Sequence, residues 1–120
     1  MVAQSIEQAR AAHAWQETNN GVDKEFVSLA SGAPALIMSN GLMQTLAFYK
    51  AKGKSHHKKL LEAVLRWLGR PGGPLAGAQS FEDAMEKLHG SDPDLYLRAT
   101  EEALEVLKWI RQFAKARERG

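Results

Sequence analysis

Basic side chains crowd one part of the sequence, and they carry the chemistry that its residue types offer most plainly. Residues 50–70 contain seven Lys or Arg side chains and one acidic residue, Glu62. The seven are Lys50, Lys52, Lys54, Lys58, Lys59, Arg66 and Arg70. Ammonium and guanidinium groups neutralise phosphate oxygens without distinguishing one base from another. The cluster predicts a surface for a phosphate chain, and the alternative is a solvated helix face.

The charge of the C-terminal part of the chain is arranged in blocks. Residues 80–105 hold eight Asp or Glu against Lys87 and Arg98, whereas residues 106–120 hold five Lys or Arg against Glu118. We predict a second basic face, ranked below the first, in the last block: Lys108, Arg111, Lys115 and Arg119. Residues 50–70 and 80–105 carry net charges of +6 and −6, which suits copies of the chain stacking head to tail.

Side chains that catalyse reactions or bind metal ions form no recognisable group. The chain has no cysteine and four histidines, of which His56 and His57 are adjacent and are expected to point to different sides of a helix. The HExxH, Walker, GxGxxG and GxSxG patterns are absent. We therefore predict no catalytic residue, no metal ligand and no cofactor, and we interpret the chain as a non-enzyme.

The elements that position the basic residues are all expected to be helices. The stretch 34–52 is apolar on nearly every side, and we expect it to form a central helix that begins at Pro34. Asn40-Gly41 is interpreted as a small pair tolerated inside that helix, and Asn40 and Gln44 as buried polar groups that fix helix packing. The helix leads directly into the lysine-rich segment.

Further helices are predicted by capping residues and apolar spacing. They start near Ser5, Asp23, Ser55, Ser80 and Asp92, and the last runs to about Arg117. No alternating strand pattern occurs. Residues 1–120 are therefore predicted to form an all-α, single compact domain of about five to seven helices, with a mobile Pro/Gly-rich loop at about 70–79. No segment resembles a signal peptide or a membrane span, so we expect a cytoplasmic protein with no membrane partner.

The segment 35–54, ALIMSNGLMQTLAFYKAKGK, resembles a family signature. The signature has a proline, an aliphatic run, Ser-Asn-Gly-Leu, Gln-Thr-Leu-Ala-Phe and a lysine-rich exit. Here these residues are Pro34, Leu36, Ile37, Ser39, Asn40, Gly41, Leu42, Gln44, Thr45, Leu46, Ala47, Phe48, Lys50 and Lys52. The pattern is similar to that of the small all-helical subunit of the type III-B CRISPR effector, the RNA-targeting Cmr (RAMP-module) complex. Residues 7–15 and 96–114 resemble the same family, whereas residues 70–90 match no motif of it.

This resemblance implies a non-catalytic small subunit in antiviral defence. Such a subunit would oligomerise along the complex and help to hold guide and target RNA while other subunits cut. Its expected partners are other subunits of the effector complex, further copies of itself, and guide or target RNA. The seven basic residues in 50–70 are then the candidate RNA contacts, and the face from Lys108 to Arg119 is the second candidate.

Two alternatives stay open at the level of sequence. A helix-turn-helix-like DNA-binding regulator would use the basic start of the helix after Gly53, although the preceding helix is too apolar to lie across a DNA backbone. A helical adaptor with no nucleic-acid role would have a basic surface that is only solvated. That adaptor would show no salt-dependent binding to RNA.

Overall fold

The computed structural model describes residues 4–119, and within this range it contains six helices. They are α1 (Ile6–Glu17), α2 (Lys24–Asn40), α3 (Leu42–Lys52), α4 (Ser55–Leu68), α5 (Phe81–His89) and α6 (Pro93–Ala116). The β-structure of the described residues is one isolated bridge between Val22 and Glu118. The predicted all-α class, with five to seven helices in one domain, is confirmed.

Four helices begin at the capping residues that the sequence indicated. Ser5 and Gln8 form a complete capping box at α1, and the side chains of Asp23, Ser80 and Asp92 accept a backbone N–H in the first turns of α2, α5 and α6. Each such cap stabilises its helix by about 1 kcal/mol. These local signals therefore fix where the helices start, independently of how they pack.

The apolar stretch 34–52 is not one helix, so that prediction was wrong. Gly41 interrupts it with φ 89° and ψ 162°, a conformation that side-chain-bearing residues rarely adopt, and α2 ends there. The first turn of α3 has no side-chain cap, but the Met43 N–H donates to the Tyr96 hydroxyl of α6 at 3.1 Å. A contact from another helix, which the local sequence does not encode, thus satisfies one backbone N–H at the new helix start.

Pro34 lies inside α2 rather than in the first turn of a helix, and α2 also continues through Ser31 and Gly32. The predicted helix boundary in this region was therefore misplaced. The buried side chains of α2 are Phe26, Ala30, Ala33 and Ile37, at a spacing of three and four residues. Packing of that stripe against α4 and α6 keeps α2 helical across Gly32 and Pro34, the two weakest helix formers in it.

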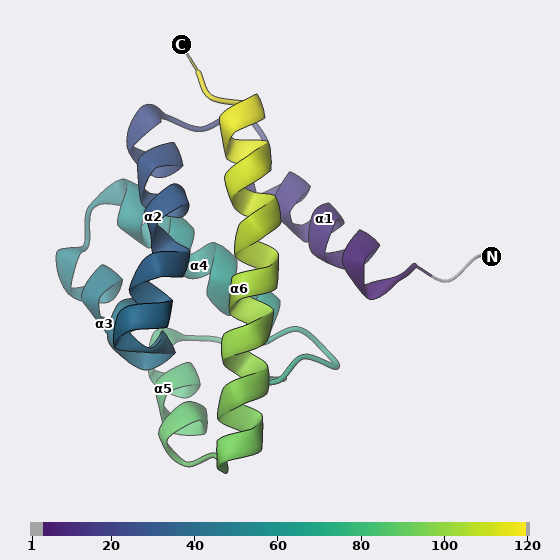
Figure 1. The fold of residues 1–120 in the computed structure, drawn as a ribbon, viewed down its shortest axis with the longest axis vertical. Helices are drawn as coiled ribbons and strands as arrows, with labels where there is room; N and C mark the ends of the chain where they lie inside the picture. Colours follow the sequence, from purple (N-terminus) through teal and green to yellow (C-terminus); the bar gives the residue numbers. More distant parts are fainter. Residues whose placement is uncertain (1–3, 120) are drawn as a thin grey trace.

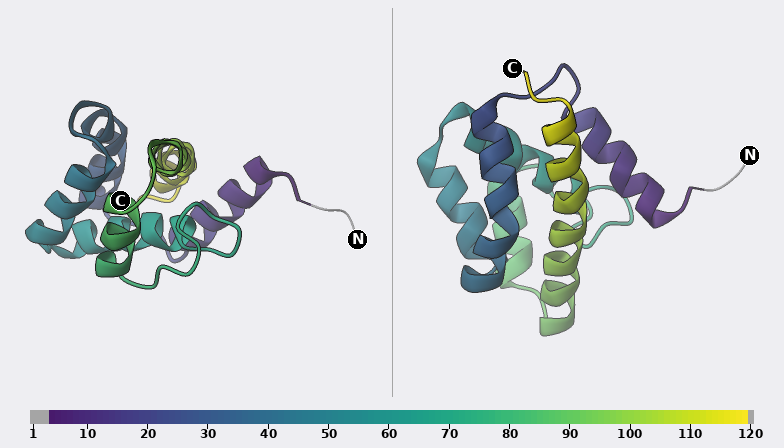
Figure 2. Two further views of the ribbon diagram at one scale, coloured as in Figure 1. Left: turned by 90° about the horizontal axis from the view of Figure 1, so that it is seen from below. Right: turned by 45° about the horizontal axis from the view of Figure 1, so that its top comes forward.

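The middle of the fold is formed by α4 and α6. Helix α4 contacts α1, α2, α3 and α6, and α6 also packs against α1 and α2 (Figures 1 and 2). Their buried side chains include Leu60, Val64, Trp67 and Leu68 of α4 and Ala99, Ala103, Val106, Leu107, Ile110 and Ala114 of α6. The small residues of α6 let neighbouring helices approach closely. No helix of the described residues is long and apolar enough to cross a membrane.

A polar cluster ties α1, α4 and α6 together. The carboxylate of Glu102 accepts hydrogen bonds from Arg10 at 2.6 and 3.1 Å and from the Trp67 indole N–H at 2.8 Å. The Arg10 and Glu102 side chains are 15% and 19% exposed. The hydrogen bond from Arg10 is the main cause that lowers the pKa of Glu102, with those from Trp67 and nearby charges also contributing.

The segment 69–80 between α4 and α5 is held by its own backbone. The N–H of Leu75 donates to the Leu68 carbonyl and that of Gly77 to the Gly69 carbonyl, and the Leu75 side chain is buried. A Cβ at Gly69 would lie 2.4 Å from the Ala78 carbonyl oxygen, so this close approach requires glycine. The mobility predicted for residues 70–79 stays a prediction.

Candidate nucleic-acid interface

The junction between α3 and α4 presents lysines because of how both helices end. Gly53 stops α3 in the left-handed region at φ 66°, and its N–H donates to the Tyr49 carbonyl. Lys54 is the N-cap residue of α4 and makes no side-chain capping hydrogen bond. Lys50 and Lys52 therefore lie in the last turn of α3, where positive charge is favourable, and Lys58 lies near the start of α4, where each exposed charge costs about 0.3–1 kcal/mol.

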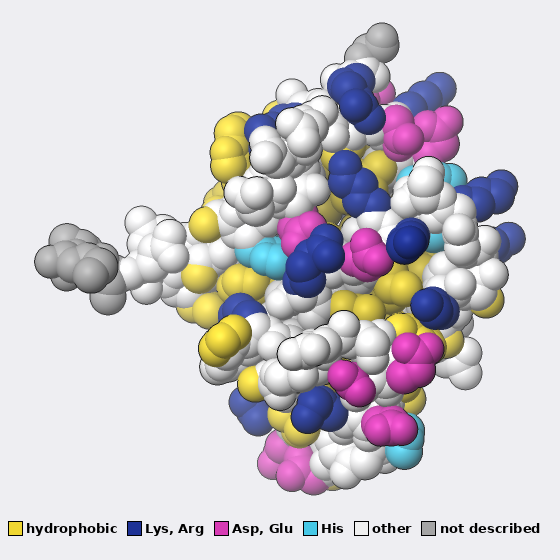
Figure 3. Space-filling view, turned by 180° about the vertical axis from the view of Figure 1, so that it is seen from behind, with side chains coloured by type: hydrophobic (Ala, Val, Ile, Leu, Met, Phe, Trp, Pro, Cys, Tyr) yellow, Lys and Arg dark blue, Asp and Glu magenta, His cyan; other side chains and the backbone are white. Residues whose placement is uncertain are grey.

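Four of the predicted residues come together at this junction, and we call them the α3–α4 lysine surface: Lys50, Lys52, Lys54 and Lys58. All four are exposed, and among the described residues none forms an ion pair with a carboxylate. The chain from residue 26 to residue 61 contains no Asp or Glu at all. Lys and Arg side chains project from the right-hand edge of Figure 3, the side on which α3 and the start of α4 lie. These ammonium groups are available to an external anion.

The other three residues predicted in 50–70 have contacts within the protein. Lys59 is half-buried, with its Nζ 3.5 Å from the Gly21 carbonyl oxygen and over the Phe26 ring. Arg66 donates two hydrogen bonds of 2.7 Å to Glu17. These partners join α4 to the chain segments before it, so Lys59 and Arg66 are first of all structural.

Arg70 is also engaged, at the end of α4. Its guanidinium lies 3.4 Å from the centroid of the Trp67 ring and donates to the Trp67 carbonyl at 2.6 Å. Burial is the main cause that lowers the pKa of Arg70, and the charge of Glu102 opposes that effect. The structure thus separates Arg70 from the α3–α4 lysine surface. The sequence shows the positive charges of Lys59 and Arg70. It does not show that they lie over the rings of Phe26 and Trp67, because those contacts form only when the helices pack.

The side chains of the second basic face are less accessible to a ligand than the spacing of these residues predicted. Lys108 pairs with Glu105 at 2.6 Å, and Arg111 is half-buried with an Nε atom that is out of contact with solvent. Lys115 is exposed, whereas Arg119 lies beyond the end of α6, where its backbone N–H donates to the Val22 carbonyl. These four residues therefore form a less continuous basic surface than the lysines of the α3–α4 junction.

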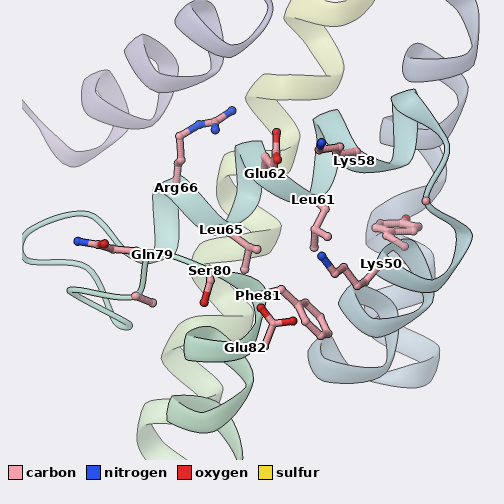
Figure 4. A pocket seen from close by; sticks show the side chains of 13 residues that line it. Lys50, Lys58, Leu61, Glu62, Leu65, Arg66, Gln79, Ser80, Phe81 and Glu82 are labelled. Carbon is pink, nitrogen blue, oxygen red and sulfur yellow. The ribbon is translucent and has the colours of Figure 1, made fainter.

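A pocket of about 540 Å³ lies next to the α3–α4 lysine surface (Figure 4). Lys50 and Lys58 line it together with the apolar side chains of Leu61, Leu65 and Phe81. The Lys50 Nζ lies 5.8 Å from the centroid of the Phe81 ring, and Figure 4 shows the two side chains facing each other. Glu62 and Glu82 also line this pocket. These carboxylates make the pocket less favourable for a phosphate than the exposed lysines beside it.

Tyr49 and His57 are buried polar side chains at the base of this region. The Tyr49 hydroxyl and the His57 Nδ1 have no hydrogen-bond partner among the described residues. Burial raises the pKa of Tyr49 to about 12, and burial followed by the charges of His56, Lys52 and Lys54 lowers the pKa of His57. Both effects disfavour the protonated form of His57, so this ring does not strengthen the positive charge of the surface.

The side chains of the described residues offer no group of three or more His, Asp or Glu that could hold a metal ion. The rings of His56 and His57 were expected to point to different sides of a helix. Instead, their centroids lie 4.4 Å apart.

One exposed row of α3 was missed by the sequence analysis. Asn40 and Gln44 were expected to be buried, but both are exposed, and Phe48 is 48% exposed. Gln44, Phe48 and Lys52 are each four residues apart, so they form one row along the helix. The buried side of α3 consists of Leu42, Thr45, Leu46 and Tyr49. The spacing of the apolar residues could have shown that the row from Gln44 to Lys52 faces away from the core.

Comparison with known proteins gives the same family at three levels. The family model described as CRISPR-associated protein (Cas_Cmr5) matches residues 6–117. The "CRISPR system Cmr subunit Cmr5" of Thermus thermophilus is 30% identical over 92 residues, which are 77% of this chain and 74% of that protein.

The fold agrees with this match. The X-ray crystal structure of a CRISPR-associated Cmr5 family protein from Thermus thermophilus is similar with a TM-score of 0.78 at 26% identity, covering 96% of this chain and 98% of that chain. The family match and the fold therefore confirm the resemblance that the segment 35–54 predicted. The chain belongs to the Cmr5 family, the small helical subunit of the type III-B Cmr CRISPR complex.

Proposed function

We propose that the chain is a non-catalytic subunit that oligomerises along a type III-B effector complex and holds guide or target RNA with the α3–α4 lysine surface. Its partners are other Cmr subunits, further copies of itself and RNA. Membership of the Cmr5 family supports the other Cmr subunits as partners and the predicted cytoplasmic location. Phosphate contact suits a subunit that must accept any guide sequence, because it does not depend on the bases.

The observation that carries the proposal is the set of four exposed lysines without carboxylate partners. Lys50, Lys52, Lys54 and Lys58 lie within nine residues of chain, in a region that has no acidic residue between Glu25 and Glu62. Their flexible stems can converge on neighbouring phosphates of one strand. Lysines that served only to solvate a helix face would more often be interspersed with acidic residues, as on α6.

A helix-turn-helix mode of DNA binding fits the structure poorly. In that mode the helix after the turn lies in the major groove and exposes one face to the bases. Here that helix would be α4, which contacts α1, α2, α3 and α6 and buries seven of its side chains. Its exposed face is therefore too narrow for the groove, and the lysines are concentrated at its start.

The proposed role in holding RNA is tested by reconstituting the complex with and without this chain. We expect the complex that contains the chain to bind single-stranded RNA more tightly. The logarithm of its affinity should also fall more steeply with the logarithm of salt concentration, by about 0.7 per phosphate contact. Equal slopes for the two complexes would reject the RNA-holding role and favour an adaptor without a nucleic-acid function.

Self-association should depend on salt because both the acidic and the basic segment carry charged side chains without an ion-pair partner among the described residues. The side chains of Glu82, Glu86, Asp94 and Glu101 form no ion pair among the described residues. They offer a partner surface to the lysines of the next copy. Light scattering should therefore show larger assemblies at low than at high ionic strength. Association that is indifferent to salt would contradict stacking by charge and indicate an apolar interface.

A further inference from the structure

Four exposed side chains on the outer face of α3 and at the end of α2 are of types that bind single-stranded nucleic acids. In chain order they are the amides of Asn40, at the end of α2, and Gln44, the phenyl ring of Phe48 and the ammonium group of Lys52. All four are exposed. At a rise of about 1.5 Å per residue, the row from Gln44 to Lys52 is about 12 Å long, enough for about two nucleotides.

A groove of about 440 Å³ runs beside this row, between the end of α2 and α3. It is lined by Leu36, Ser39, Asn40, Gln44, Thr45 and Phe48. The hydroxyls of Ser39 and Thr45 already donate to the carbonyls of Ala35 and Gly41. The side-chain amides of Asn40 and Gln44 make no hydrogen bond among the described residues. These amides are therefore the polar groups of the groove that are available to a ligand.

The positive charge around the groove indicates which class of ligand it would bind. The Lys52 Nζ lies 5.5 Å from the centroid of the Phe48 ring, and neither residue has an acidic neighbour in the chain from residue 26 to residue 61. A half-exposed aromatic ring beside unpaired lysines is the arrangement by which proteins stack bases and neutralise the phosphates between them. An acidic or purely apolar partner would leave either the amides or the ring without a matching group.

We propose that Phe48 is a stacking platform for a base of single-stranded RNA, with Lys52 on the adjoining phosphate and the Gln44 or Asn40 amide on the edge of the base. This inference rests on the proposed RNA-holding function and adds a base contact to its phosphate contacts. Amide side chains donate and accept hydrogen bonds at once, so they can pair with the edge of any unpaired base. Exposed alanines at 47 and 51 flank the row and leave the ring accessible.

The test is Phe48→Ala in the reconstituted complex, with a fluorescein-labelled RNA that carries a single-stranded segment beyond the part complementary to the guide. We expect the affinity to fall about 5- to 150-fold, the range of one base stacked on one aromatic side chain. The salt slope should stay unchanged because the phosphate contacts remain. Phe48→Trp should retain the affinity. RNA carrying 5-iodouridine should crosslink to residue 48 on irradiation in the wild-type complex.

Leu97→Ala is the matched control, since Leu97 is 56% exposed on α6 and lies outside the groove. It should leave RNA affinity unchanged. Unchanged affinity of the Phe48→Ala complex would overturn the platform. Loss of the subunit from the Phe48→Ala complex, or a smaller assembly, would also overturn it and would make this face a protein interface.

A second variant keeps the inference testable if Phe48→Ala is poorly folded. Gln44→Glu adds a carboxylate to the groove on an exposed helix position, where the fold should tolerate it, and we expect it to weaken RNA binding at least several-fold. If variants of the lysines reduce the salt slope but variants of Phe48 and Gln44 change nothing, the platform fails and the RNA-holding function stands. If neither set has an effect, both fail.

Discussion

Replacement of Glu102 by alanine is expected to lower the free energy of unfolding by about 2–3 kcal/mol. Glu102 accepts hydrogen bonds from both Arg10 and the Trp67 indole, so the variant leaves a guanidinium and an N–H without a partner where α1, α4 and α6 meet. Urea denaturation followed by circular dichroism measures the loss.

Glu105→Ala is the matched control. Glu105 is 38% exposed, pairs with Lys108 at 2.6 Å and lies 3.8 Å from Arg10. Exposed pairs of this kind contribute about 0–1 kcal/mol, so this variant should be nearly as stable as the wild type. A loss at Glu105 as large as that at Glu102 would show that general charge, rather than the three-way contact, stabilises the junction of the helices.

The same cluster predicts how stability depends on pH. Because Arg10 lowers the pKa of Glu102 in the folded protein, the contribution of Glu102 is complete above the pKa of an unfolded glutamate, about 4.3, and is lost as the pH falls through the folded pKa. The difference in stability between the wild type and Glu102→Gln should therefore narrow on acidification. A difference that stays constant from neutral to acidic pH would contradict this account.

Local signals predicted most of the fold. Capping residues such as Ser5 and Asp92 act within one helical turn, so the starts of their helices could be placed from the sequence. The break at Gly41 could not, because Asn40-Gly41 tolerates either a continuous helix or a turn. The choice depends on packing and on the Tyr96 hydroxyl, which lies 53 residues from Met43 in the chain.

The candidate site was predicted only in part, because local sequence patterns do not show which side chains come into contact when the helices pack. Charge clustering identified Lys50, Lys52, Lys54 and Lys58, whose exposure follows from the ends of α3 and α4. It also included Arg66, which binds Glu17, although no local pattern connects residues 49 positions apart. The exposure of Phe48 was missed because an aromatic residue in an apolar stretch is more often buried than exposed, although its spacing from Gln44 and Lys52 placed it on the outer face of the helix.

Charge reversal of three lysines is expected to have the largest effect on function. The variant Lys50→Glu, Lys52→Glu, Lys54→Glu removes three of the four members of the α3–α4 lysine surface. RNA affinity of the assembled complex should fall on the order of 10- to 100-fold near physiological salt. All three side chains are exposed, so the helical content should not change. Replacement of the same three lysines by glutamine should weaken binding in the same direction by a smaller factor.

Changing Lys108, Arg111 and Lys115 to glutamate provides the control, since it alters the net charge of the chain by the same amount. Lys108 is already paired with Glu105, and Arg111 is half-buried. We expect a smaller loss of RNA affinity from this variant. A loss equal to that of the first variant would indicate a general electrostatic effect without a defined surface.

The most direct measurement of the central claim is the slope of log affinity against log salt for RNA binding by complexes that carry the two triple variants. Loss of three phosphate contacts should reduce the slope by about 2 for the Lys50, Lys52 and Lys54 variant, because each contact with a single strand contributes about 0.7. The slope for the Lys108, Arg111 and Lys115 variant should stay close to that of the wild type. Wild-type affinity and an unchanged slope in the first variant would contradict the claim that the α3–α4 lysine surface holds RNA.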